Sequence, residues 1–346
     1  MRAQSVSGAI EAAELGVVLP HEHLHADLRL FLGDRDNDPR PLATVPRPEL
    51  ERMPMAFLEN LDLLDDGTVA QEVAAYRRAG GRTIVELTPI DLGRDPVTLK
   101  RIAAQSGLRV IMGTGYYVRA SHPPGLAEST TERIAKTFIG DINDGIAGVR
   151  AGVIGEIGTS DPLDPQEATV VRAAARAQLA TGCPINIHFA GGCREAFHVL
   201  DLLRDSGLTD LSRVVVSHMD VVIDLDQQRE VAQRGAIVEY DTFGHEAYPD
   251  SRGNRMPRDE ERVAGIAQLL EWGLGANVLV SQDVCLRTLW HAYGGRGYDN
   301  LLTRIPSLMR AHGIDEKAQA ELMITNPARV FSFLPSEIDV RIGGDS

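Results

Sequence analysis

Two histidines stand two residues apart in an apolar run, a spacing that suits metal binding. They are His21 and His23, within residues 19–24. Side chains two apart on a β-strand point to the same side, so two imidazoles at a strand end can bind one cation together. A pair of surface histidines at a strand end is the alternative interpretation of so short a motif.

Four further side chains of metal-ligating type each end an apolar run. A carboxylate at the end of a buried strand is costly unless it is paired or bound to a metal, and for Glu156 a salt bridge to an arginine at the rim is the alternative. Asp283 could ligate a metal and accept a proton from bound water, or cap the following segment. The four residues are Glu156, His188, His218 and Asp283.

The combination of these six residues indicates a metal centre more strongly than any one of them. Imidazole and carboxylate ligands suit zinc, with manganese, cobalt or nickel as alternatives. One catalytic zinc with an open position needs fewer ligands, whereas two divalent ions bridged by Glu156 and a hydroxide would use them all. The sequence therefore predicts a binuclear centre that activates water, with Asp283 as the catalytic residue.

Eight apolar runs alternate with amphipathic stretches along the chain. Near-continuous apolar strands separated by helices indicate a parallel sheet buried on both faces. Eight such units favour a closed (β/α)8 TIM barrel, whose active sites form at the carboxyl ends of the strands, over an open doubly wound sheet. The absence of a GxGxxG motif after the first run also disfavours dinucleotide binding. The expected strands span residues 16–23, 82–87, 110–113, 151–156, 184–188, 214–218, 236–241 and 278–283.

Helices are expected between these strands, and one has clear ends at Asp164-Pro165 and Gly182. We expect one domain over residues 1–346, with its core at about 16–331, a short N-terminal strand extension and a C-terminal helix. Residues 33–52 predict a long loop over the barrel mouth or at an interface. The other helices are expected at about 68–79, 95–106, 129–143, 195–206, 225–234, 258–272, 297–312 and 315–324.

The composition narrows the classes of partner. The net charge of −14 disfavours nucleic acid and anionic membranes as partners, which leaves a small-molecule substrate. Three cysteines at 183, 193 and 285 are not typical of a disulfide framework. The N-terminus lacks the pattern of a signal peptide, and no apolar run is long enough to span a bilayer, so a cytoplasmic location is expected.

With these motifs the chain resembles the phosphotriesterase family of the amidohydrolase superfamily. The resemblance implies that His21, His23 and Asp283 bind a buried metal, and that His188 and His218 bind a more exposed one. Many members bridge the metals with a carboxylated lysine, which residues 151–160 lack. The chain is similar to the glutamate branch, the phosphotriesterase homology and phosphotriesterase-related proteins, which implies Glu156 as the bridge. The segments that carry the resemblance are 19–24, 113–118, 151–160, 217–220, 281–283 and 326–331.

That branch includes lactonases and N-acetyltaurine amidohydrolases, and the resemblance also implies a homodimer. We expect the bridging hydroxide to attack the carbonyl of a carboxylic amide or of a lactone or ester. Asp283 would then carry the proton to the leaving group. A phosphotriester hydrolase is one alternative. A barrel that binds a small molecule without catalysis, its metal centre being incomplete, is another.

Residues that follow the strands are candidates for the surroundings of the centre. Asp220 could orient a metal-bound histidine or relay the proton, or it could simply cap a helix. Five others could form the wall of a substrate pocket, and loop packing is the alternative for each of them. They are Tyr116, Tyr117, His245, Arg287 and Trp290.

Overall fold

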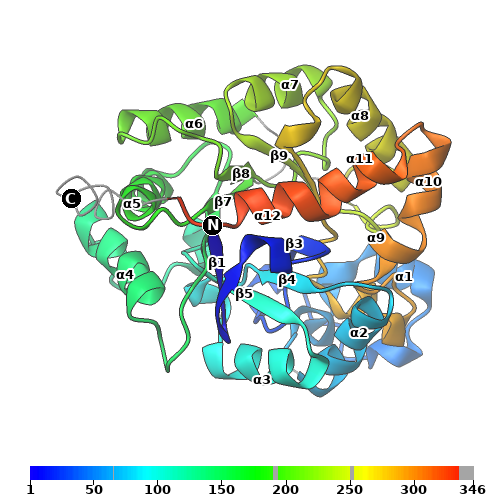
Figure 1. Cartoon of the computed structure of the whole chain (residues 1–346). Coiled ribbons are helices and arrows are strands. Elements are labelled where there is room, and N and C mark those ends of the chain that lie inside the picture. Colours follow the sequence, from blue (N-terminus) through cyan, green and yellow to red (C-terminus); the bar gives the residue numbers. More distant parts are fainter. Residues whose placement is uncertain (65, 190–193, 250–252, 335–346) are drawn as a thin grey trace.

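Eight parallel strands form one sheet in the computed structural model, which describes residues 1–64, 66–189, 194–249 and 253–334 (Figure 1). The strands are neighbours in chain order, as the predicted barrel requires. The amide of Asp283 donates to the carbonyl of His21 at 3.1 Å, which brings the last strand segment against the first. The predicted (β/α)8 barrel is confirmed. Its strands are β3 (Val18–Glu22), β4 (Thr83–Glu86), β5 (Arg109–Thr114), β6 (Val153–Thr159), β7 (Ile185–Phe189), β8 (Val214–Val216), β9 (Ile237–Tyr240) and β10 (Val278–Val280).

Helices surround the sheet (Figure 1). α5 starts and ends as predicted, because Asp164 caps its first turn and Gly182 takes the left-handed conformation at φ 69°. The helix expected at 297–312 is instead two helices, because Pro306 lacks the amide that would continue the first. The main helices are α2 (Asp66–Arg78), α3 (Pro96–Ser106), α4 (Thr131–Asn143), α5 (Pro165–Thr181), α6 (Arg194–Asp205), α7 (Leu225–Gln233), α8 (Asp259–Glu271), α9 (Asn300–Thr303) and α10 (Ile305–Ala311).

The amino end of the barrel is covered by the N-terminal hairpin and by the last helices that the structure describes. An antiparallel hairpin of β1 (Arg2–Ser5) and β2 (Gly8–Glu11) lies there, and the amide of Val6 donates to the carbonyl of Val110 at 2.9 Å. The hairpin contributes Ala3 and Ile10 to an apolar cluster inside the barrel, and the C-terminal helical segment contributes Phe331 to the same cluster. This segment consists of α11 (Glu316–Ala320), a π-helical turn (Glu321–Thr325) and α12 (Asn326–Val330).

The segment between β3 and β4 is ordered rather than irregular. It contains α1 (Arg47–Arg52) and short 3-10 turns, and it has a small apolar cluster of its own that includes Leu50 and Phe57. Arg47 fastens it to the rim of the barrel by donating to the carbonyl of Tyr293 at 3.0 Å. Parts of this segment reach the barrel mouth, as described below. Across the described residues, no helix has both the length and the apolar character needed to cross a membrane.

Candidate metal centre and active site

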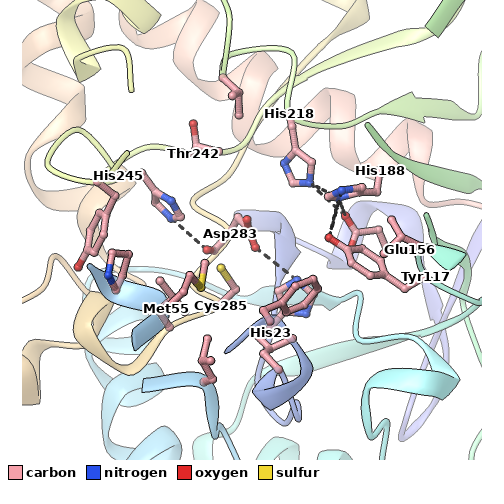
Figure 2. A pocket seen from close by; sticks show the side chains of 18 of the residues that line it. His23, Met55, Tyr117, Glu156, His188, His218, Thr242, His245, Asp283 and Cys285 are labelled. Carbon is pink, nitrogen blue, oxygen red and sulfur yellow. Dashed lines mark hydrogen bonds and ion pairs between the residues drawn. The ribbon is translucent and has the colours of Figure 1, made fainter. Parts of the chain in front are cut away.

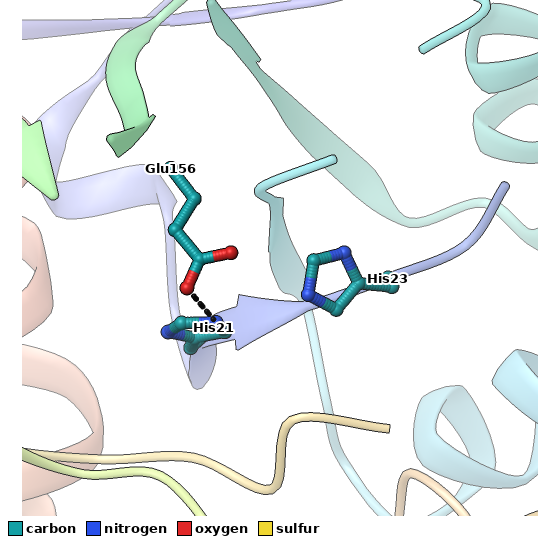
Figure 3. Close-up of side chains that lie close together, drawn as sticks. All are labelled: His21, His23 and Glu156. Atoms are coloured by element: carbon teal, nitrogen blue, oxygen red, sulfur yellow. Dashed lines mark ion pairs between the residues drawn. The ribbon is translucent and has the colours of Figure 1, made fainter. Parts of the chain in front are cut away.

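The six predicted ligands converge at the carboxyl end of the barrel. Glu156 is central, because its Oε1 lies 2.9 Å from His188 Nδ1, 3.1 Å from His218 Nε2 and 3.5 Å from His21 Nε2. Asp283 Oδ1 lies 3.3 Å from His23 Nε2 and 3.9 Å from His21 Nε2. Figure 3 shows the Glu156 carboxylate directed at His21, with His23 beside it. Three triads of these side chains bring their ligand atoms within 4.8 Å of one another.

The sequence predicts each of these residues at the end of a strand, but the structure places several of them elsewhere. Strand β6 continues to Thr159, so Glu156 lies in its middle. His218 and Asp283 lie beyond the ends of β8 and β10, in the left-handed region at φ 60° and 46°. That conformation is uncommon for residues with a Cβ atom and marks a local constraint on the backbone.

Three of the histidines present the same nitrogen to the centre. The Nδ1 atoms of His21, His23 and His218 each meet an outer acceptor, so each Nδ1 carries the proton and Nε2 is left for a ligand. The buried Nε2 of His21 and the buried Oδ1 of Asp283 make no hydrogen bond among the described residues. A bound cation would satisfy both atoms, so the side chains present fit a metal centre.

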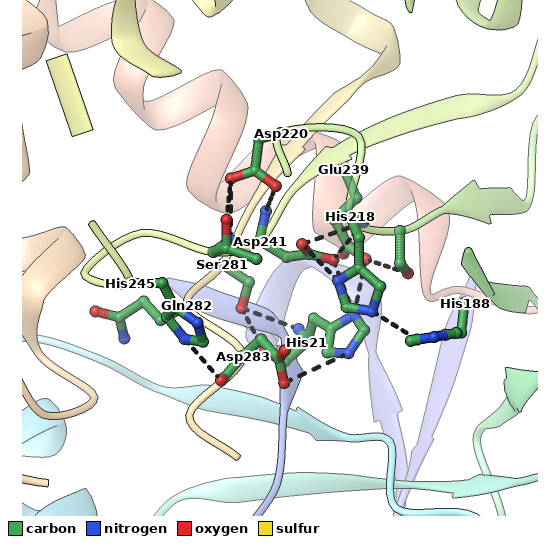
Figure 4. A network of polar contacts seen from close by, with 12 residues as sticks. His21, His188, His218, Asp220, Glu239, Asp241, His245, Ser281, Gln282 and Asp283 are labelled. Atoms are coloured by element: carbon green, nitrogen blue, oxygen red, sulfur yellow. Dashed lines mark hydrogen bonds and ion pairs between the residues drawn. The ribbon is translucent and has the colours of Figure 1, made fainter. Parts of the chain in front are cut away.

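The acceptors behind the ligands include residues that the sequence interpretation missed (Figure 4). Asp241 Oδ1 lies 3.0 Å from His218 Nδ1, and its Oδ2 lies 3.1 Å from His21 Nδ1. Glu239 Oε2 lies 3.1 Å from the same nitrogen of His21. The glutamate of the seventh barrel strand and the aspartate that follows it therefore fix the orientation of two predicted ligands from other parts of the barrel.

A similar contact supports His23 on the other side. Its Nδ1 lies 3.0 Å from Thr88 Oγ1, which in turn donates to the buried Glu86 carboxylate at 2.5 Å. The chain of contacts leaves His23 Nε2 facing Asp283. Glu86 and Glu239 both interrupt otherwise apolar strands, and that interruption is the sequence feature that could have identified them.

Glu22, the last residue of strand β3, lies between His21 and His23 and positions the segment that carries Asp283. Its carboxylate accepts from Ser281 Oγ at 2.8 Å, from the amide of Gln282 at 3.0 Å and from the amide of Val284 at 2.8 Å. These bonds hold the residues on both sides of Asp283. The motif therefore provides two of the predicted ligands and, through Glu22, the placement of a third.

The centre carries an excess of buried acidic groups. Six carboxyl groups lie in the centre or directly behind it. Within the part of the chain that is described, none of them makes a hydrogen bond or ion pair with a lysine or an arginine. Burial raises the pKa of Glu22 to about 8 and that of Glu239 to about 7. Burial opposes ionisation of Glu156 too, but His188 and His21 hold its pKa well below the usual range. Divalent cations would neutralise the negative charge of the ionised carboxylates. The six carboxyls are those of Glu22, Glu86, Glu156, Glu239, Asp241 and Asp283.

Asp220 lies one step farther from the centre than the sequence suggested. It touches neither His21 nor His218. Its carboxylate accepts from the amide of Asp241 at 3.2 Å and from the buried Arg262 at 2.8 Å. One of the roles considered for Asp220, contact with a predicted histidine ligand, belongs instead to Asp241, whose backbone amide Asp220 holds.

A cavity of about 410 Å³ opens onto the cluster (Figure 2). Of the five predicted wall residues, Tyr117 and His245 line it. The Tyr117 hydroxyl lies 3.0 Å from His188 Nδ1, and His245 Nε2 donates to the carbonyl of Asp283 at 3.1 Å. Their contact with a substrate stays a prediction. Much of the remaining wall is apolar and comes from segments that the sequence interpretation did not assign to it.

The other three predicted wall residues lie away from this cavity. Tyr116 points to the opposite side of the chain from Tyr117 and packs 5.8 Å from the ring of Phe138. Arg287 stacks 5.6 Å from the ring of Trp290, and its Nε donates to the carbonyl of Asp62. Trp290 is fully buried in the core. For these three, the packing alternative describes the structure better than the pocket wall.

The cysteines show no disulfide in the described chain. Cys183 and Cys285 are both free thiols, and Cys285 lines the cavity. Cys193 lies outside the described residues.

The conversion of Asp241 to asparagine should weaken metal binding about 10- to 100-fold. An asparagine side chain has only one carbonyl oxygen, so it cannot accept from both His21 and His218 as the carboxylate does. Competition with a fluorescent chelator would measure the affinity. Asp36→Asn, at an exposed position, has the same charge change and should bind metal normally. Unchanged affinity in Asp241→Asn would contradict the role of this carboxylate.

The barrel and its ligand cluster define a hydrolase architecture with a candidate metal centre. The family model described as the phosphotriesterase family matches residues 1–331, and the chain belongs to that family. The predicted resemblance is thereby confirmed. N-acetyltaurine hydrolase of Salmo salar is 35% identical over 343 residues, covering 96% of this chain and 98% of the relative. Since its relatives include hydrolases over the full length, the chain is a hydrolase.

Two solved structures extend this comparison. A resiniferatoxin-binding protein from Rhodobacter sphaeroides is 36% identical with a TM-score of 0.89, covering 96% of this chain and 95% of that chain. The phosphotriesterase homology protein of Escherichia coli, solved with phosphate in its active site, is 30% identical with a TM-score of 0.79 and covers 92% of this chain and 99% of that chain. Both share the barrel over nearly its whole length.

Proposed function

We propose that the protein is a binuclear metal-dependent hydrolase that cleaves a carboxylic amide, or a lactone or other ester, of a small molecule. The position of the Glu156 carboxylate carries the proposal. It lies between His21 on one side and His188 and His218 on the other, at 3.5, 2.9 and 3.1 Å. A carboxylate placed between two sets of imidazoles has the arrangement that a bridging ligand needs.

The chain's residues divide into two sets around this carboxylate. His21, His23 and Asp283 would hold one divalent ion, and His188 and His218 the other, with Glu156 shared. Their nitrogen and oxygen donors suit zinc, and also manganese, cobalt or nickel. When bound, the ions would supply water that ionises near neutral pH and a Lewis acid for the carbonyl oxygen.

Asp283 is the base of the proposed reaction. Burial opposes its ionisation, but the neighbouring His23 and the charge of His21 hold its pKa below the usual range, so it is a carboxylate at neutral pH. Its side chain borders the cavity and can take a proton from the attacking water. For an amide it must then deliver that proton to the leaving nitrogen. The Tyr117 hydroxyl, which faces the cavity beside His188, would donate to the carbonyl oxygen of the substrate.

Two observations bear on the bond that is cleaved. The relatives named N-acetyltaurine hydrolase support an amide. The Escherichia coli relative with phosphate in its active site supports testing phosphotriesters as well, because the same centre could direct water to phosphorus. A comparison of kcat/KM on an N-acyl amine, a γ-lactone and paraoxon separates these classes. A paraoxon value far above the other two would reject the carbonyl substrate.

Removal of metal tests the proposal as a whole. We expect about two equivalents of metal per chain, loss of activity on dialysis against a chelator and its return with zinc or manganese. Elemental analysis and rate measurements on the same samples would show this. A protein that contains no metal and hydrolyses its substrate equally well after chelation would contradict the binuclear centre. A protein with metal and no hydrolysis of any class would support the non-catalytic alternative.

A further inference from the structure

The cavity wall above the centre is largely apolar and contains no lysine or arginine among the described residues. From it we infer that the substrate carries an uncharged hydrocarbon group, not an anionic one, beyond the bond that is cleaved. This inference rests on the proposed hydrolase function and adds the substrate class. It excludes a substrate that is recognised through a sulfonate or phosphate group.

Four separate parts of the chain contribute large apolar side chains to the wall. The segment between β3 and β4 contributes Leu28, Phe31 and Met55, strand β7 contributes Phe189, and the segments after β9 and β10 contribute Met256 and Leu286. Figure 2 shows Met55 directed at the same space as His23, Asp283 and His245. Within the described lining, no residue is a lysine or an arginine. A cavity of this size with apolar walls and a polar floor is typical of small-molecule sites.

Apart from that of Tyr117, the hydroxyl groups in the wall are already engaged by the protein. Ser160 Oγ donates to Glu167 at 2.7 Å, Thr242 Oγ1 donates to Asp220 at 2.9 Å, and Tyr248 donates to the carbonyl of Thr288 at 3.2 Å. A hydroxyl has one hydrogen to donate, so these three offer none to an anionic group. A sulfonate placed against these three hydroxyls would lose its water without gaining hydrogen bonds from them.

A guanidinium group that lies nearby is directed away from the cavity. Arg47 donates through Nη2 to the Tyr248 hydroxyl at 3.0 Å and through Nε to Glu51 at 2.6 Å. It stacks on the Tyr248 ring, with 5.8 Å between the guanidinium carbon and the ring centroid, and is not among the lining residues. Its hydrogen bonds are therefore used to attach the β3–β4 segment. The positive charge of the metal centre would act on the oxygen of the reacting carbonyl, and not on an anionic group elsewhere in the substrate.

Matched substrates test the inference directly. The full chain, loaded with manganese, is assayed on N-acylethanolamines and N-acyltaurines of equal acyl length, and on γ-lactones with alkyl chains of rising length. We expect kcat/KM to rise about fourfold for each added methylene. We also expect the neutral compound of each pair to exceed the sulfonate by at least about tenfold. A preference for acetyl over octanoyl groups, or for taurine over ethanolamine, would overturn the inference.

Calorimetric binding to Asp283→Asn separates this inference from the proposed function. If the wild-type protein hydrolyses nothing but the variant binds the octanoyl ethanolamide better than the octanoyl taurine, the hydrolase proposal fails and the substrate class stands. If short or sulfonated substrates are hydrolysed best, the hydrolase proposal stands and the substrate class fails. Failure of the variant to bind either octanoyl compound also counts against the apolar site.

Two methionines of one loop provide a matched pair of variants. Met55 lines the cavity, whereas Met53 is 41% exposed and lies outside it. Met55→Ala should lower the ratio of octanoyl to acetyl kcat/KM about tenfold, because it removes apolar contacts from the wall. Met53→Ala should leave that ratio unchanged. Equal ratios in the two variants would remove Met55 and its segment from the specificity of the site.

Discussion

Asp283→Asn should lower kcat on the order of 10³-fold while leaving the fold intact. The substitution keeps the shape of the side chain but removes the charge that holds a cation and the group that accepts a proton. The side chain lies 3.3 Å from His23 Nε2 and borders the cavity, so no neighbouring carboxylate occupies the same place. The backbone around it is held independently by Glu22, which protects the local conformation.

Steady-state rates and near-ultraviolet circular dichroism on the same preparations would test this expectation. Asp36→Asn is the matched control, since it makes the same chemical change at an exposed position. Wild-type spectra with the lowered kcat would assign the loss to chemistry. Turnover close to that of the wild-type protein would remove Asp283 from the mechanism.

Glu156→Gln should reduce the metal content from about two ions per chain to one or fewer and lower kcat at least on the order of 10³-fold. A neutral amide offers one carbonyl oxygen and no charge, so it cannot serve two cations as a carboxylate can. The same change also removes the negative group that lies near His21, His188 and His218. The side chain is 2% exposed, so bulk solvent cannot replace it as a ligand.

Elemental analysis after gel filtration would measure the metal content of this variant. The exposed Glu128→Gln provides the control for removal of one glutamate charge. Added zinc or manganese at high concentration should restore little of the rate, because the bridging group itself is missing. Two tightly bound ions in Glu156→Gln would show that Glu156 is not the bridge.

The ligands could be predicted from the sequence because a barrel fixes where strand ends lie. Eight apolar runs identify the strands, and polar residues of ligand type near their carboxyl ends must then meet at one rim. The strand positions were less accurate, as Glu156 in the middle of β6 shows. Such details depend on how far the pairing of β6 with β7 continues, which a run of apolar letters does not contain.

The groups behind the ligands could not be predicted in the same way. Glu239 and His21 are 218 residues apart and meet only because the barrel closes. A buried acid in an apolar strand shows that some partner is required, but not which one. The wall residues Phe31 and Met55 lie in a segment with neither strand nor helix periodicity, so nothing in their spacing connected them with the cavity.

The conformations of His218 and Asp283 have a consequence for how this protein tolerates change. Each holds an L-residue with φ near +50°, which costs about 1–2 kcal/mol relative to an ordinary conformation. Glycine would relax the chain at either place, but would delete an imidazole or a carboxylate from the centre. At these two positions, stability of the fold and catalytic activity therefore favour different amino acids, and selection for one works against the other.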